Sequence, residues 1–200
     1  MLGDRIEAAT LLAAAAGTGG QIEVKGCSQE ALKATLDVLI EAGCEVSETS
    51  GAIILKGPAN LKSFSFVTAP FPGLATDMQP LLMALACKAS GVSKIEEKIF
   101  ESRFGHIAEY RRFGAEIEVA GREATVKAAS SLQGASAHAG DIRAAAGLVL
   151  MGLFSEGLTS VFGIHHLDRG YDKLEHKLSM LGARISRTPV YEDKELVIGC

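Results

Sequence analysis

Apolar residues follow two different periods along the 200-residue chain, and the change from one period to the other divides it into helices and strands. Three segments are apolar on nearly all sides of a helix, and such a helix must be buried all round. We therefore predict buried helices over residues 8–16, 80–89 and 144–154. Three further segments have the one-sided period of a half-exposed helix. Each ends at a glycine, the residue that most readily follows a helix C-terminus: Gly43, Gly114 and Gly182.

These glycines mark an internal repeat. The last apolar residue of the helix lies four positions before each glycine, and an apolar strand residue lies three positions after it: Leu39 and Val46, Tyr110 and Ile117, Leu178 and Ile185. Strand-like runs around Ile22, Ile95 and Val161 precede these helices, and two runs follow each helix: 44–47 and 53–55, 115–119 and 124–126, 184–186 and 196–198. Opening strands are predicted at 63–67 and 132–137, whereas unit one lacks its opening strand or receives it from elsewhere.

The repeat predicts the fold class. Each unit has the order strand, helix, strand, helix, strand, strand, and the units cover approximately residues 1–58, 59–128 and 129–200. Three buried helices are most economically placed together inside an outer layer of sheets. We predict a single α/β (α+β) domain over residues 1–200, built from three βαβαββ-type repeats with pseudo-threefold symmetry.

The composition is typical of a globular protein without an extended basic surface. Hydrophobic residues make up 48% of the chain, and 20 basic against 24 acidic residues give a net charge of −4. Because no Lys/Arg tract is present, general binding to nucleic acid or to a membrane surface is not expected. No apolar stretch reaches the roughly 20 residues of a membrane-spanning helix, and no signal-peptide pattern is seen. We expect a cytoplasmic protein.

The cysteines and histidines do not form a metal-binding pattern. The four cysteines are far apart and include no C-x-x-C pair, so neither a zinc site nor a disulfide framework is expected. We interpret Cys27, Cys44 and Cys87 as core thiols and Cys200 as a frayed end. The adjacent pair His165 and His166 lacks a third ligand at a recognisable spacing. We therefore expect no metal and no cofactor.

An aspartate opens each unit: Asp4, Asp77 and Asp141 precede the three buried helices. A carboxylate at this place accepts free backbone N–H groups, and its presence in all three units favours a capping role. Asp77, however, follows a stiff, uncharged loop with two prolines at residues 68–76. Such a loop can hold a carboxylate in a fixed place, as a general base requires. Both interpretations remain open for Asp77.

Two arginines occupy a repeat-equivalent place. Arg103 and Arg169 each lie eight positions after the central strand residue of their unit and before its second helix, where unit one has Glu30. Two guanidinium groups on equivalent turns can converge on one anion, since their geometry suits a carboxylate or phosphate. Exposed arginines in ordinary surface pairs explain the spacing equally well. For Arg143, two positions after Asp141, we favour an ion pair with a neighbouring carboxylate.

Several stretches resemble the UDP-N-acetylglucosamine enolpyruvyl (1-carboxyvinyl) transferases, and they run in order through nearly the whole chain. They are GDRIE at 3–7, TAPFPG at 68–73 with TDMQ at 76–79, IFESRF at 99–104, GDIRA at 140–144 and HLDRGY at 166–171. The related shikimate-pathway transferase shares the fold but lacks the TAPFPG…TDMQ and HLDRGY patterns. Ala75 and Ser102 stand where the family usually has proline and asparagine.

The resemblance implies an inside-out α/β barrel protein of two similar domains, with the substrates bound between them. This chain resembles the second, C-terminal domain alone. The family transfers the enolpyruvyl group of phosphoenolpyruvate to the 3-hydroxyl of UDP-N-acetylglucosamine, through a tetrahedral adduct, and releases phosphate. This reaction is the first committed step of bacterial peptidoglycan synthesis.

The resemblance also assigns roles by motif. Asp77 would contact the sugar 3-hydroxyl as its base, and the main chain at Ile99 would help to hold the nucleotide sugar. Arg103 and Arg169 would bind phosphoenolpyruvate. The supporting residues of the cleft would be Asp141, Arg143 and Phe100.

A large part of the family's site is absent from this chain. The reactive cysteine, which is the general acid and the thiol alkylated by fosfomycin, belongs to the first domain, and none of the four cysteines here occupies its motif. We expect the chain alone to fold without catalysing, to bind its substrates jointly with the first domain, and to self-associate through an exposed inter-domain face. Two alternatives remain: a truncated shikimate-pathway relative, and a non-catalytic domain that binds a nucleotide sugar or a protein.

Overall fold

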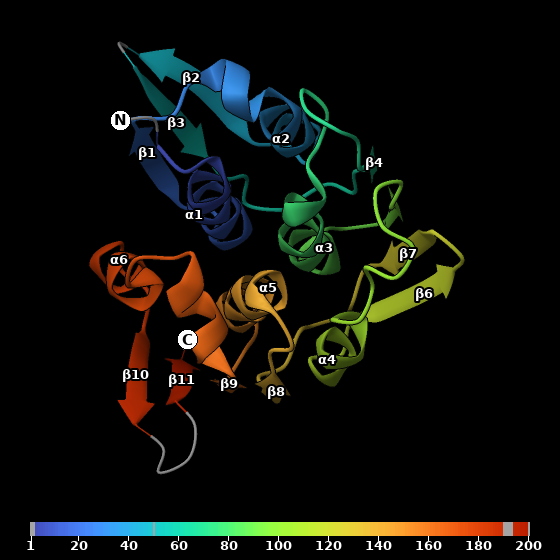
Figure 1. Cartoon of the computed structure of the whole chain (residues 1–200), viewed down its shortest axis with the longest axis vertical. Coiled ribbons are helices and arrows are strands. Elements are labelled where there is room, and N and C mark those ends of the chain that lie inside the picture. The colour runs from blue at the N-terminus through green and yellow to red at the C-terminus, as the bar shows by residue number, and fades with distance from the viewer. Residues whose placement is uncertain (1–2, 50, 190–193, 200) are drawn as a thin grey trace.

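The computed structural model describes residues 3–49, 51–189 and 194–199, and it confirms the α/β architecture, with helices inside and sheets outside (Figure 1). The elements in chain order are α1 (Arg5–Thr18), β1 (Gln21–Lys25), α2 (Gln29–Glu41), β2 (Glu45–Thr49), β3 (Ala52–Lys56), β4 (Phe66–Val67), η1 (Thr76–Met78), α3 (Gln79–Lys88), β5 (Val92–Glu96), α4 (Ile107–Arg112), β6 (Glu116–Ala120), β7 (Glu123–Lys127), β8 (Ser136–His138), α5 (Ile142–Phe154), β9 (Leu158–Phe162), η2 (Ile164–Arg169), α6 (Leu174–Met180), β10 (Ile185–Pro189) and β11 (Lys194–Gly199).

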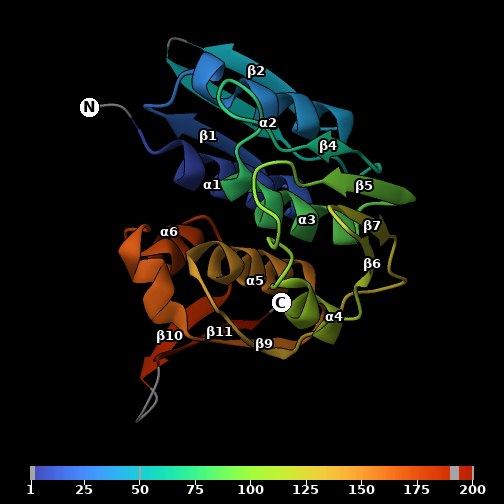
Figure 2. The ribbon, with the colours of Figure 1, turned by 45° about the vertical axis from the view of Figure 1, so that its right-hand side comes forward.

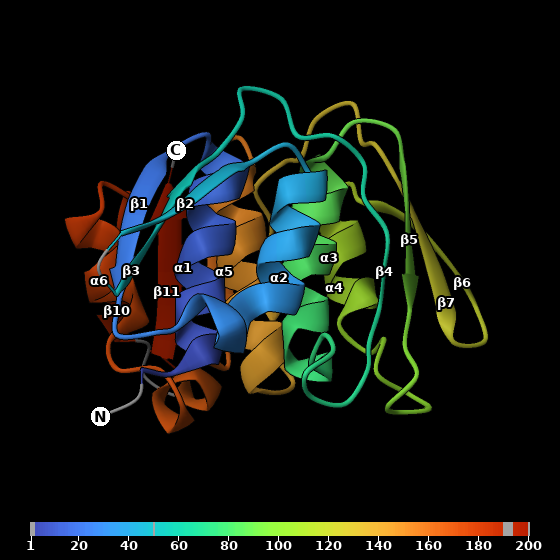
Figure 3. The same cartoon turned by 90° about the horizontal axis from the view of Figure 1, so that it is seen from above.

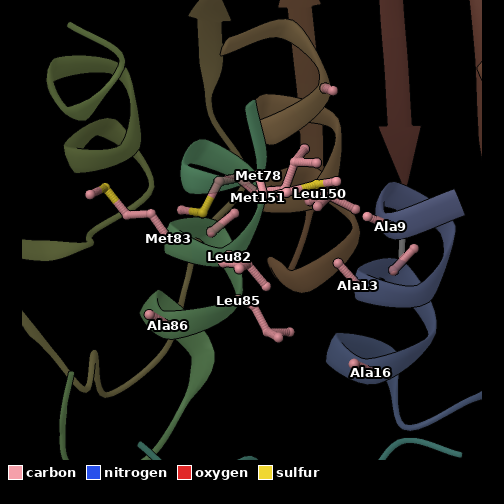
Figure 4. Close-up of a cluster of buried hydrophobic side chains, with 14 of the residues drawn as sticks. Ala9, Ala13, Ala16, Met78, Leu82, Met83, Leu85, Ala86, Leu150 and Met151 are labelled. Carbon is pink, nitrogen blue, oxygen red and sulfur yellow. The ribbon is translucent and has the colours of Figure 1, made fainter. Parts of the chain in front are cut away.

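The three helices predicted to be buried form the centre of the molecule. Helices α1, α3 and α5 contact one another, and Figure 3 shows them side by side between the sheets. Every residue from Gln79 to Cys87 in α3 and from Ala144 to Gly152 in α5 is buried. Alanine, leucine and methionine side chains fill the space between the helices (Figure 4). The prediction that helices without a polar face are buried on all sides is thus confirmed.

Three sheets surround these helices (Figure 2). Their strand orders are β1-β3-β2, β4-β5-β7-β6 and β8-β9-β11-β10, and the strands pair in matching registers. Ile22 lies opposite Leu55, Ser93 opposite Val126 and Thr159 opposite Ile198. The registers therefore match Ile22 with Ser93 and Thr159, two residues before the Ile95 and Val161 that the sequence spacing indicated. In the two larger sheets the opening strand of the unit, β4 or β8, runs parallel to its neighbour. The other strand pairs in these sheets are antiparallel. The shared order and register confirm three βαβαββ-type repeats with pseudo-threefold symmetry.

The first sheet has three strands among the described residues, in agreement with the opening strand that the sequence does not supply. Where unit one meets unit two, and unit two meets unit three, an extended segment buries a leucine, Leu61 or Leu132. Where unit three meets unit one, the structure has instead a largely apolar groove lined by residues that include Leu11, Leu178 and Leu181.

Two predicted strands are shorter than the pattern indicated. The runs 63–67 and 132–137 pair fully only over β4 and β8, with single bridges at Lys62 and Gln133 before them. Side-chain hydroxyl groups replace part of the ladder in unit two, since the Phe64 N–H donates to Ser93 Oγ. Bonds of this kind depend on a residue far along the chain, so the local alternation does not reveal them.

The local signals for helix ends and core thiols are confirmed. Gly43, Gly114 and Gly182 have positive φ angles of 99°, 86° and 101°, as predicted for glycines that follow helices. Cys27, Cys44 and Cys87 are free and buried, whereas Cys200 lies outside the described residues. No helix in the described part of the chain combines the length and the hydropathy needed to cross a membrane.

Candidate functional site

The three repeat-equivalent aspartates do not play the same role. Asp4 caps α1, where its Oδ1 accepts a hydrogen bond from the Ile6 N–H at 2.7 Å, and Asp141 caps α5 by accepting from the N–H groups of Arg143 and Ala144. Asp77 lies in the 3-10 turn η1 before α3, and among the described residues its carboxylate accepts no backbone N–H. The capping interpretation therefore holds for Asp4 and Asp141, while Asp77, for which it was left open, is not a cap.

Asp77 instead joins two arginines from different units. The Arg143 Nε donates to Asp77 Oδ1 at 2.9 Å, and Arg103 Nη2 lies 3.3 Å from the same oxygen. The ion pair favoured for Arg143 exists, and its partner is Asp77 rather than the adjacent Asp141. Within the described structure no donor binds the second oxygen, Oδ2. One carboxylate oxygen is thus held in place while the other remains able to accept a proton from a ligand.

A buried hydrogen-bond chain positions Arg143. Thr10 Oγ1 donates its only proton to the Ile6 carbonyl at 2.8 Å, so the Tyr171 hydroxyl, 3.0 Å away, must donate to Thr10. The Tyr171 oxygen is then free to accept a hydrogen bond from Arg143. Burial raises the pKa of Tyr171, which keeps the hydroxyl protonated and able to donate. Burial disfavours the charged form of Arg143, yet its bonds to Asp77 raise the pKa of Arg143 overall.

The turn before α4 carries three residues of the predicted site. The Arg103 guanidinium lies over the Phe100 ring, with its Cζ 5.2 Å from the ring centroid, which is a cation–π contact. The backbone N–H of Ile99 donates to Glu97 Oε1 at 2.8 Å. Because this N–H is already bonded, the carbonyl oxygen is the main-chain atom of Ile99 that remains for a ligand.

Glu97 is a residue that the sequence interpretation missed. Its side chain is buried and accepts hydrogen bonds from Thr68 and Thr76, in the loop before Asp77, and from the backbone of the turn that leads to Arg103. The strand pattern contained a signal for it, because Ser93, Ile95 and Glu97 alternate onto the buried face of β5 and the residue after it. A carboxylate on a buried face calls for several donors around it.

Arg169 stands apart from the Asp77 cluster. It ends η2 and is exposed, and its side chain forms no hydrogen bond or ion pair with any residue that the structure describes. The turn that follows packs against the start of α5, since a Cβ at Gly170 would lie 2.5 Å from Ile142 Cδ1. Arg169 also lies only two residues before Tyr171, whose hydroxyl contacts Arg143. Its convergence with Arg103 on one anion stays a prediction.

The histidines lie outside this chemistry. His106 is buried beside Met83, with its Nε2 3.3 Å from the Met83 sulfur, and burial lowers the pKa of His106 to about 4. The rings of His165 and His166 lie against each other. Among residues 3–49, 51–189 and 194–199, no group of three or more His, Cys, Asp or Glu side chains is arranged to bind a metal ion.

Curated proteins share close sequence similarity with this chain. A UDP-N-acetylglucosamine 1-carboxyvinyltransferase of Trichlorobacter lovleyi is 50% identical over 184 residues, which cover 92% of this chain and 44% of that protein. A protein of the same name from an Anaeromyxobacter species is 48% identical over 187 residues, 94% of this chain and 44% of its own length. The chain thus spans less than half the length of these relatives.

Solved structures show the same fold. The enolpyruvyl transferase NikO from Streptomyces tendae matches with a TM-score of 0.81 and 25% identity, over 100% of this chain and 45% of that chain. The EPSP synthase from Acinetobacter baumannii matches with a TM-score of 0.74 at 18% identity, over 100% of this chain and 46% of its own, which supports the fold alone. A family model also matches residues 1–178. Through that match, the chain belongs to the family of EPSP synthase (3-phosphoshikimate 1-carboxyvinyltransferase), the enolpyruvyl transferases.

Proposed function

We propose that this chain is the C-terminal half of an enzyme that transfers the enolpyruvyl group of phosphoenolpyruvate to the 3-hydroxyl of UDP-N-acetylglucosamine, a cytoplasmic step of bacterial peptidoglycan synthesis. The observation that carries the proposal is the meeting of Asp77, Arg103 and Arg143 from separate segments, where no donor in the described part of the chain binds the second Asp77 oxygen. The relatives that are 46–50% identical to most of this chain have the name of that transferase, which supports the choice of acceptor.

The proposed chemistry begins with the acceptor hydroxyl. Asp77 Oδ2 takes the hydroxyl proton while the sugar oxygen bonds to C2 of phosphoenolpyruvate, and the methylene carbon gains a proton from an acid outside this chain. The tetrahedral adduct then releases phosphate and loses a proton from the new methyl group, which restores the double bond. Arg103 and Arg169 supply positive charge to the phosphate and carboxylate groups.

The chain alone is expected to fold without turning over substrate. It spans 44% of the length of its relatives, and a half site cannot exclude water or surround the developing charge. Phe71 in the loop before Asp77 and Phe100 in the turn before Arg103 are 61% and 49% exposed. We infer that these apolar rings face the missing half, and that the isolated chain self-associates through this face.

The shikimate-pathway alternative rests on the name of the matching family model. Structures of EPSP synthases, however, share 17–18% identity with this chain, against 46–50% for the nucleotide-sugar transferases. Substrate-contacting positions diverge with the substrate more than the fold does, so the difference in identity favours a nucleotide-sugar acceptor.

A chimera tests the proposal. The chain replaces the matching segment of the Trichlorobacter lovleyi transferase, and phosphate release is measured with phosphoenolpyruvate and either UDP-N-acetylglucosamine or 3-phosphoshikimate. We expect turnover with the nucleotide sugar, none with 3-phosphoshikimate, and loss of turnover in the Asp77→Ala chimera. A folded chimera that uses only 3-phosphoshikimate, or turnover by the 200-residue chain alone, would contradict the proposal.

Calorimetry addresses the non-catalytic alternative. The isolated chain should bind UDP-N-acetylglucosamine weakly, and adding the relative's other half should strengthen binding. Tight binding by the isolated chain, unchanged by the second polypeptide, would indicate a binding module instead.

A further inference from the structure

Glu97 is a carboxylate placed inside the protein next to the candidate site. Its relative exposure is 1%, and two hydroxyls and two backbone amides surround it. Thr68 Oγ1 donates to Oε1 at 2.8 Å, and Thr76 Oγ1 donates to Oε2 at 2.8 Å. The N–H groups of Ile99 and Phe100 donate to Oε1 at 2.8 and 3.1 Å. A buried carboxylate needs hydrogen-bond donors around it, and four surround this one.

These four bonds join two segments that carry the proposed substrate contacts. Thr68 and Thr76 are the two ends of the loop that leads into Asp77, and Ile99 begins the turn that leads to Arg103. Thr68 Oγ1 also accepts from the Lys98 N–H at 2.9 Å, which fixes the direction of the hydroxyl. The loop and the turn therefore meet through one side chain.

The other two units contain no counterpart of this carboxylate. The matching registers place Gly26 of unit one and Gly163 of unit three at the position of Glu97. Both glycines have positive φ angles, so the other two units form this turn without any side chain. A buried carboxylate at this position of unit two is thus unnecessary for the repeat and calls for a separate explanation.

We propose that Glu97 is the positioning residue of the nucleotide-sugar side of the site: it holds the loop that ends at Asp77 at a fixed distance from the main chain of Ile99. The inference rests on the proposed function for the identity of the ligand, but the contact network that it invokes belongs to this chain. Glu97 acts through Asp77 and Ile99 and touches no substrate itself.

The first test uses nuclear magnetic resonance and amide exchange on the 200-residue chain. Thr76→Val keeps the shape of the side chain and removes the single bond between Glu97 and the residue before Asp77. We expect the Arg143 Nε–H signal, which reports the contact with Asp77, to shift, while Ile99 and Phe100 keep their amide protection. Thr76→Ser retains a hydroxyl and should restore the wild-type Arg143 signal.

Glu97→Ala removes all four bonds. It should increase amide exchange at Ile99 and Phe100 at least tenfold and shift the same Arg143 signal. The control is Glu41→Ala, which removes a carboxylate that accepts one backbone N–H, from Ser65, away from the site. An unmoved Arg143 signal in Thr76→Val would overturn the proposal, even if Glu97→Ala failed to fold.

The second test measures kinetics in the chimera. For Thr76→Val and Glu97→Ala we expect KM for the nucleotide sugar to rise at least tenfold, while KM for phosphoenolpyruvate changes less than threefold. A uniform loss of kcat with both KM values unchanged would indicate a structural role and overturn the inference. If the unsubstituted chimera is folded and inactive with the nucleotide sugar, the proposed function fails, and the resonance data still decide the role of Glu97.

Discussion

Replacing Asp77 by asparagine removes one negative charge and changes little else in shape. In the structure this charge is shared by Arg143 at 2.9 Å and Arg103 at 3.3 Å, both at Oδ1. An asparagine oxygen still accepts hydrogen bonds there, but the two guanidinium groups then lie close together without a counter-charge. Asp77→Asn should therefore lower the stability of the chain and strengthen its binding of anions.

The magnitude follows from the two contacts. A hydrogen bond to a charged group contributes about 1.5–3 kcal/mol, and partial exposure reduces that figure. The side chains of Asp77, Arg103 and Arg143 are 35%, 26% and 18% exposed, and the amide keeps part of each bond. We expect the free energy of unfolding to fall by about 1–2 kcal/mol, which corresponds to roughly 3–6 °C in Tm for a chain of this size.

Thermal unfolding followed by circular dichroism, with and without inorganic phosphate at constant ionic strength, measures both effects. Phosphate should raise the Tm of Asp77→Asn more than that of the wild type, because it replaces the missing counter-charge. Asp37→Asn is the matched control: its partner Lys33 is an exposed helix neighbour, so a loss of only about 0.3–0.5 kcal/mol is expected. The reasoning is refuted if Asp77→Asn is as stable as the wild type, or if phosphate stabilises both proteins equally.

Three further predictions concern the surroundings of the site. Tyr171→Phe removes the hydroxyl that contacts Arg143 and should cost about 1–2 kcal/mol in urea unfolding; an unchanged midpoint would contradict the hydrogen-bond chain. Gly147→Ala places a Cβ onto the hydroxyl of Tyr110, whose side chain reaches from α4 to the Pro80 carbonyl of α3, and should cost about 1–3 kcal/mol; an unchanged Tm would contradict this close packing. The pKa of His106 is lowered from 6.5 to about 4 by burial, so the unfolded chain binds the extra proton first as pH falls. Stability should drop by about 3 kcal/mol between pH 6.5 and 4, and His106→Gln should reduce that slope in urea unfolding across the same range.

The architecture could be predicted because its signals are local. A glycine after a helix, such as Gly43 or Gly114, adopts its positive φ whatever the rest of the chain does. An all-apolar helix has no stable place except the interior, so the three central helices followed from composition alone. The length of β4 could not be predicted, because the Ser93 hydroxyl that replaces its ladder bond lies 29 residues from Phe64.

The contacts of the candidate site could be predicted only in part, because they join distant segments. The spacing of the aspartates favoured capping at Asp77, and nothing near it in the sequence indicates that Arg143, 66 residues away, approaches its carboxylate. For Glu97 the strand alternation indicates an inward direction, but the donors Thr68 and Thr76 become visible only once the loop is folded back. The sequence thus indicated which residues belong to the site, but the contacts between them are seen only in the folded structure.

The repeat itself provides the strongest argument for where the site lies. Three units of one fold show which residues the frame requires, since positions that serve packing are filled alike in each unit. Unit two departs from this pattern where Asp77 does not cap its helix and where Glu97 stands at a position that is glycine in the other two units. One departure gives up a helix cap and the other buries a carboxylate, and the two are linked because Thr76, the residue before Asp77, donates to Glu97. Residues that depart from the frame at a cost to stability, and that meet at one place, are explained by binding and catalysis rather than by folding.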